Sequence, residues 1–171
     1  MVTKEPSGGV RIGNVTGGIL GSVIAGRDVS NVTVTLGGKQ TTANKEPSID
    51  EFKQLIMEIQ KELAELTTKK DALKEVSPAA PSLAQGAKDS IDNVEQTVKD
   101  KPVIKPEEGE KVKKVLLDAS GLIGIILDEA KSIANKAVDA GKAMKPVLDA
   151  LGPLLDRISI AALWAAKLWS V

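Results

Sequence analysis

The sequence predicts a mainly α-helical protein: an antiparallel helical bundle of long, coiled-coil-like helices, preceded by a short Gly-rich β module. Apolar residues recur at spacings of three and four over most of residues 48–171, which is the helix period. Residues 8–38 are instead rich in glycine and β-branched residues, and in part alternate with the strand period. A polar stretch, KQTTANKEP, separates the two patterns. We therefore divide the chain into a strand module (1–38), a linker (39–47) and a helical bundle (48–171).

The strand module is predicted to contain three or four short strands, with turns near Gly17-Gly18 and Arg27-Asp28. A spacing of about five between apolar residues would also suit a β-solenoid coil. Short strands cannot bury themselves, so they need either the helices or copies of themselves as partners. Few charges and no proline in residues 8–38 favour pairing between chains. The predicted assembly residues are Val10, Ile12, Val15, Ile19, Val23, Ile24, Val29, Val32 and Val34.

The string IGNVTGGILGSVIAGRDVSNVTV, residues 12–34, carries a resemblance. It resembles the Gly-rich strand segments, with a core like G-x-V-x-G-x-x-x-x-G-x-D-V, that lie beside effector or sensor domains in bacterial conflict and programmed-death systems. Some of those segments look like amyloid-type signalling motifs. The resemblance implies homotypic assembly and no catalytic residue.

The first helix has a clear start, because Ser48 and Glu51 form a capping-box pattern. An apolar seam then runs from Phe52 to Leu66, and Ser77-Pro78 is expected to end the helix. Three acids in this helix could suggest acid chemistry or a metal site, but without histidine we interpret them as a solvated face: Glu58, Glu62 and Glu65.

Two further helices are expected, one over residues 82–100 and one beginning at Pro106. The second of these has apolar residues on so many sides that we predict burial around much of its first half, including Val115, Leu117, Leu122, Ile125 and Leu127. Gly121 and Gly124 there suit close helix approach or bending. Gly141 and Pro146 are expected to end or kink this helix.

The last segment is the most apolar in the chain, with only three polar residues in 158–171. Gly152-Pro153 is expected to kink or restart its helix. Its setting can be the bundle core, an interface between subunits, or a membrane surface with tryptophan rings at headgroup depth. The predicted membrane or interface residues are Ile158, Ile160, Leu163, Trp164, Leu168 and Trp169.

Composition argues against several function classes. Lys plus Arg and Asp plus Glu number 23 each, so no global field attracts nucleic acid. Cysteine, histidine and tyrosine are absent, which removes thiol chemistry and the commonest general base and metal ligand. Only carboxylates such as Asp128 and Glu129 remain as catalytic candidates, and nothing in the sequence orients them. We expect no enzyme activity, cofactor or metal, and a cytoplasmic protein that is membrane-associated when active.

The sequence therefore predicts a self-assembling, homo-oligomeric effector or adaptor of a bacterial conflict or defence system. The strand module would drive assembly, and the apolar C-terminal helix would act on a membrane or a partner. The alternative is a passive oligomeric helical scaffold that docks a partner protein through the N-terminal strands. The expected partners are the chain itself, a partner protein or a membrane, and no nucleic acid.

Overall fold

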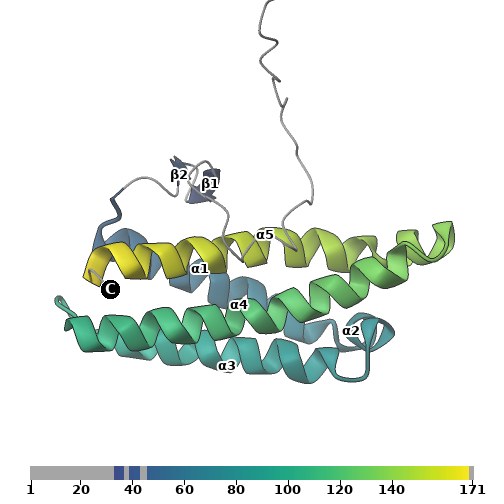
Figure 1. Ribbon diagram of the computed structural model, residues 1–171, viewed down its shortest axis with the longest axis horizontal. Coiled ribbons are helices and arrows are strands. Elements are labelled where there is room, and N and C mark those ends of the chain that lie inside the picture. The colour runs from purple at the N-terminus through teal and green to yellow at the C-terminus, as the bar shows by residue number, and fades with distance from the viewer. Residues whose placement is uncertain (1–32, 37–38, 43–45, 170–171) are drawn as a thin grey trace, which may run out of the picture.

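The computed structural model describes residues 33–36, 39–42 and 46–169, and over these residues the chain is mainly α-helical, as predicted (Figure 1). Two short strands precede the helices: β1 (Thr33–Leu36) and β2 (Lys39–Thr42). The helices within the described ranges are α1 (Ile49–Thr68), α2 (Lys70–Val76), α3 (Ala80–Val98), α4 (Pro106–Ala134) and α5 (Val138–Trp169).

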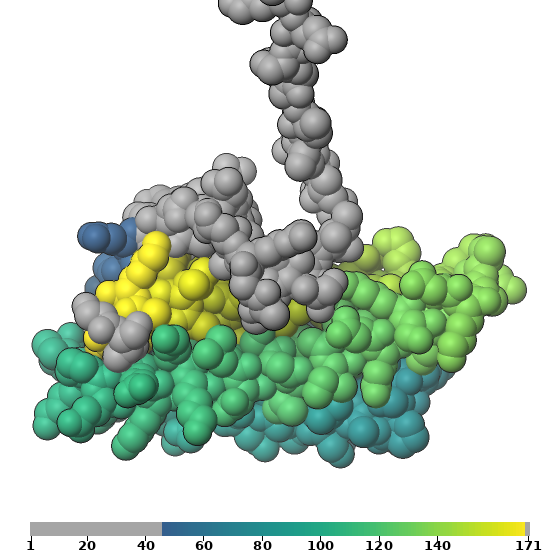
Figure 2. Space-filling model, viewed as in Figure 1, coloured from purple at the N-terminus to yellow at the C-terminus, as the bar shows by residue number. Residues whose placement is uncertain are grey.

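The four long helices form an antiparallel bundle. α1 packs on α3, α3 on α4 and α4 on α5, and α5 returns to contact α1 (Figure 1). Short connections place consecutive helices side by side with opposite directions. The short α2 crosses one end of the bundle, where it contacts α3, α4 and α5. Figure 2 shows α4 in green across the near face, between α5 and α3.

One continuous hydrophobic core runs along the bundle axis, and each helix contributes its apolar stripe. Burial of large apolar side chains is the main favourable contribution to folding, at roughly 1.5–3 kcal/mol for each. The largest side chains that are fully buried are Phe52, Leu55, Ile56, Ile59, Leu63, Leu73, Ile91, Leu116, Ile123, Ile126, Leu151 and Trp164.

The start of α1 confirms the predicted capping box. The backbone N–H of Glu51 donates to the Ser48 hydroxyl at 3.2 Å, and the backbone N–H of Ser48 donates to the Glu51 carboxylate at 3.0 Å. Two otherwise unpaired N–H groups at the helix terminus are thereby satisfied.

The expected single helix from Ser48 to Val76 is divided in two at Lys69, which has ψ of +46°. The hydroxyls of Thr67 and Thr68 donate to the carbonyls of Ala64 and Glu65, and such bonds compete with regular helix structure. The break allows α2 to turn across the end of the bundle, which buries Leu73 and Val76.

The boundary between α4 and α5 also differs from the prediction. α4 ends at Ala134, ahead of Gly141, and α5 then runs without a break through Pro146 and Pro153. An interior proline costs about 3 kcal/mol in a helix. Both rings lie on the exposed side, while the opposite stripe of α5 is buried, so tertiary packing offsets this cost. Gly141 does not end α4. Instead it leaves room for the end of that helix, since an added Cβ would lie 3.2 Å from the Ala134 carbonyl oxygen.

β1 and β2 form an antiparallel hairpin in which Thr33 pairs with Thr42 and Leu36 pairs with Lys39. β1 lies within the predicted strand module, but β2 lies in the stretch that the sequence analysis assigned to a linker. The two residues between them are glycines, which favour two-residue hairpin turns, and Thr41 and Thr42 suit a strand. The other predicted strands and turns fall outside the described residues.

Candidate functional site

The predicted membrane or interface residues of α5 lie in the bundle. Ile158, Ile160, Trp164 and Trp169 are buried, and Leu163 and Leu168 are half-buried. In the folded bundle, referred to below as the closed bundle, the other helices therefore cover most of the apolar surface of this segment. Contact of these residues with a lipid or with another subunit remains a prediction, and it requires α5 to leave its place.

Trp169 closes one end of the bundle. Its ring meets Phe52 of α1 edge-on, with ring centroids 5.2 Å apart and planes at 88°. Gly109, in the first turn of α4, lies directly beneath it, and a Cβ at this position would overlap the Cβ and ring carbons of Trp169. A glycine is therefore required by the close approach of α5 to α4.

Trp164 lies deeper in the core and is fully buried. Its indole N–H has no hydrogen-bond partner among the described residues. A buried tryptophan N–H usually has a partner, and leaving such a donor unpaired costs about 1–3 kcal/mol. The closed position of α5 therefore leaves one polar group of this helix unsatisfied.

Two charged residues of α5 lie between helices. Arg157 forms an ion pair with Glu62 of α1, so this glutamate does not belong to a purely solvated face, as the sequence analysis assumed. Next to it, burial raises the pKa of Asp156 to about 6, and the nearby Lys131 ammonium of α4 offsets part of the effect. At neutral pH this group is mostly ionised, so the folded bundle holds a carboxylate in a setting where burial disfavours its charge.

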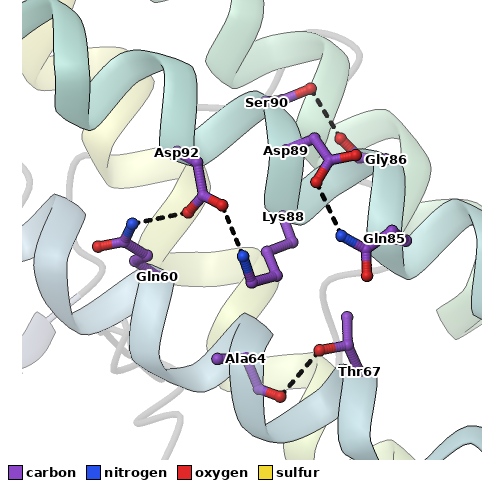
Figure 3. Close-up of polar contacts among 9 residues, drawn as sticks. All are labelled: Gln60, Ala64, Thr67, Gln85, Gly86, Lys88, Asp89, Ser90 and Asp92. Carbon is purple, nitrogen blue, oxygen red and sulfur yellow. Dashed lines mark hydrogen bonds and ion pairs between the residues drawn. The ribbon is translucent and has the colours of Figure 1, made fainter.

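A different polar cluster joins α1 to α3 (Figure 3). The Gln60 side-chain amide and the Lys88 ammonium each donate to the Asp92 carboxylate, at 2.6 Å. Burial acts to raise the pKa of Asp92, but the hydrogen bonds from Lys88 and Gln60 outweigh it and hold this pKa below its ordinary value. The carboxylate is thus fully engaged, and the cluster fixes α1 against α3 rather than presenting a reactive group.

The carboxylates that were the remaining catalytic candidates do not form a cluster. Asp128 is exposed on α4, whereas Glu129 is half-buried with one oxygen that has no hydrogen-bond partner. Among the described residues, no three carboxylates, histidines or cysteines gather in a group that could hold a metal ion. The expectation that the protein is not an enzyme stays a prediction.

Of the predicted assembly residues, only Val34 lies in the part of the chain that the structure describes. It is in β1, opposite Thr41 of β2. The structure therefore leaves the assembly of the strand module as a prediction. The other predicted residues lie outside the described ranges: Val10, Ile12, Val15, Ile19, Val23, Ile24, Val29 and Val32.

One surface was missed by the sequence analysis. Leu117 and Ile125 of α4 were expected to be buried, but their side chains are 45% and 47% exposed. They lie on one stripe with Gly121, where an added Cβ would meet nothing within 4 Å. The sequence contained a signal for this exposure. Positions 117, 121 and 125 follow one another at intervals of four, so they share one face of the helix, and this face is turned away from the stripe of buried residues.

Comparisons with known proteins identify no relative. No protein-family model matches the chain, and no curated protein or solved structure is significantly similar to it. Within the described residues, no helix combines the length and the apolar character needed to cross a bilayer.

Proposed function

We propose that this chain is a self-assembling effector or adaptor of a bacterial conflict or defence system, and that it acts without making or breaking covalent bonds. The strand module pairs between chains, and the apolar end of α5 is the acting surface. The resemblance of residues 12–34 to assembly segments of such systems supports the first part. The state of α5 in the closed bundle supports the second.

The observation that carries this proposal is that the most apolar segment of the chain, the end of α5, is buried in the bundle together with polar groups that this burial disfavours. Trp164 is buried with an unpaired N–H, and Asp156 is held where burial disfavours its charge. Both groups gain a better environment if α5 moves out. The hydrogen bond from Gln60 to Asp92 joins α1 to α3, whereas the Arg157–Glu62 ion pair joins α5 to α1 and has to break when α5 moves.

In this mechanism, pairing of strand modules gathers several bundles at high local concentration. The ends of α5 are then released together, and their tryptophan and aliphatic side chains enter a lipid interface or contact a partner. Tryptophan favours the headgroup region of a membrane, where its ring is in an apolar setting and its N–H is solvated.

A leakage experiment tests the proposal. The full-length protein is added to dye-filled vesicles of phosphatidylethanolamine and phosphatidylglycerol, with brominated lipids as fluorescence quenchers. The chain has only two tryptophans, and both are in α5, so quenching reports directly on this helix. We expect leakage together with quenching.

Asp156→Asn provides the matched variant, because it removes the charge that the closed bundle disfavours. It should slow leakage and quenching at neutral pH by holding α5 in place. Asp149→Asn is the control, since Asp149 is an exposed carboxylate of the same helix whose one ion pair with a described residue is to Lys145, four residues away. Leakage that proceeds without quenching, or equally fast in both variants, would contradict the assigned role of α5.

The alternative function is a passive oligomeric scaffold that docks a partner protein through the N-terminal strands. It is favoured by the burial of Ile158, Trp164 and Trp169 in the bundle, which leaves α5 with no need for another partner. A scaffold predicts no leakage and no quenching from protein that is nevertheless oligomeric in solution.

A further inference from the structure

We infer that the outward face of α4 is a second self-association surface, through which two copies of the bundle pair in an antiparallel arrangement centred on Gly121. This interface belongs to the folded bundle. It requires neither the strand module nor a membrane, and so goes beyond the proposed function.

The face consists of a single stripe at spacings of three and four, and each of its members is exposed: Glu110, Lys114, Leu117, Gly121, Ile125, Asp128 and Ser132. The buried residues of α4 lie on the opposite side of the helix, against α3 and α5. Figure 2 shows α4 along the near face of the bundle. The centre of the stripe is apolar, with Leu117 and Ile125 on either side of Gly121.

Gly121 is costly within the bundle and has no packing role there. Glycine in the interior of an exposed helix is about 1 kcal/mol less favourable than alanine. At Gly109 and Gly141 a close neighbour accounts for the glycine, but nothing lies within 4 Å of an added Cβ at Gly121, Gly124 or Gly152. Of these three, Gly121 is the one on the exposed stripe. A residue without a side chain, placed between two large apolar side chains, allows the backbone of a second helix to approach closely.

Charge complementarity identifies the second helix as another copy of α4. In an antiparallel pair with a two-fold axis at residue 121, each residue faces the one at equal distance on the other side of 121. Leu117 then faces Ile125 of the second copy, and Lys114 faces its Asp128. Lys114 and Asp128 form no ion pair or hydrogen bond with another described residue. Two apolar contacts and two ion pairs therefore form at once, whereas a parallel pair would place like charges together.

The first test is site-specific cross-linking of the full-length protein. The chain has no cysteine, so Gly121→Cys introduces a single thiol on the proposed axis. We expect mild oxidation to link two chains through it, because a disulfide needs Cα atoms within about 7 Å. Ser82→Cys, at an exposed position of α3, is the control and should remain mostly unlinked. Equal linking of the two variants overturns the inference.

The second test uses charge reversal and mixing. Lys114→Glu places two acids opposite each other, and Asp128→Lys places two lysines opposite each other. Each variant alone should self-associate at least about tenfold more weakly, because two pairs change from attraction to repulsion. A mixture of the two variants should pair again, since both contacts are then between opposite charges. Both substitutions are at exposed positions, and circular dichroism checks that each variant folds.

Two outcomes overturn the inference. One is a mixture that associates no better than either variant alone. The other is that a cysteine at 121 links within its own chain to a cysteine placed in residues 1–32, which would mean that this segment covers the face. Association of the charge variants is read as the yield of the disulfide between two copies of Gly121→Cys. This yield reports which positions of α4 meet, so assembly through the strand module does not decide either result.

Discussion

At the residue scale, two glycines of α4 differ in whether the structure leaves room for a side chain. Gly109 is required by the ring of Trp169, which occupies the space that a Cβ would take. Gly124 lies in the same helix with nothing within 4 Å of an added Cβ. The same substitution should therefore change stability in opposite directions at these two positions.

We predict that Gly109→Ala lowers the free energy of unfolding by about 1–3 kcal/mol, the usual cost of overpacking. Gly124→Ala should raise it by up to about 1 kcal/mol, because alanine is the better helix former. Urea denaturation followed by circular dichroism measures both. Equal shifts in the two variants would mean that Trp169 does not lie on Gly109 in solution.

A second prediction at this scale concerns Asp156. Its pKa is raised to about 6 in the folded protein, against an ordinary value of about 3.9 in the unfolded chain. The folded state thus binds this proton more tightly, so the contribution of Asp156 to stability is greatest below pH 4 and is lost as the pH rises to about 6. Asp156→Asn removes this loss.

The stability gained by Asp156→Asn over the wild type should therefore grow between pH 4 and pH 6 and then level off. The difference in stability between the variant and the wild type is the quantity to compare. The lowered pKa values of Asp92 and Glu108 make stability rise with pH in both proteins, and this effect cancels in the difference. Thermal melts across this range are the measurement. A difference that is independent of pH would contradict the burial of this carboxyl group.

At the scale of the element, α1 depends on its N-terminal cap. Ser48→Ala removes the acceptor for the Glu51 N–H, and we expect it to cost about 1 kcal/mol. Ser82→Ala is the matched control, because Ser82 is exposed and its hydroxyl makes no hydrogen bond with a described residue; its effect should stay within about 0.5 kcal/mol. Chemical denaturation compares the two. Similar losses would show that the capping box does not stabilise α1.

At the scale of the whole molecule, the bundle should be able to fold without the strand module. The described hydrophobic core runs from Phe52 to Trp169, Ile49 packs against it and Pro47 is buried, and the cap of α1 lies within Pro47–Glu51. We predict that a chain of residues 46–171 keeps a cooperative melt and a helical circular dichroism spectrum, with fewer chains per particle in solution than the full-length protein.

Light scattering after size-exclusion chromatography measures the mass of the particles. An unchanged number of chains per particle, obtained by dividing the mass by that of one chain, would mean that residues 1–45 are not needed for assembly. A chain that loses its cooperative melt would show instead that these residues are part of the core.

Local patterns in the sequence predicted much of the fold, because they depend on residues that are neighbours along a helix. The cap at Ser48, the seam from Phe52 to Leu66 and the start of α4 at Pro106 are of this kind. The apolar end of α5 could likewise be selected as a candidate site from hydrophobicity alone. Helical class and the start of each of these elements therefore follow from the sequence.

Only the tertiary structure decided which apolar residues are covered. Leu117 and Ile125 are as hydrophobic as Leu116 and Ile123, yet the first pair is half-exposed and the second fully buried, since α3 and α5 cover one side of α4 only. The continuation of α5 through Pro146 and Pro153 was decided in the same way. The sequence by itself determined where helices and apolar stripes occur. Contacts between segments that are distant in the sequence determined which apolar stripe is buried and where each helix ends. The energies of these contacts are larger than the local conformational preferences of the residues.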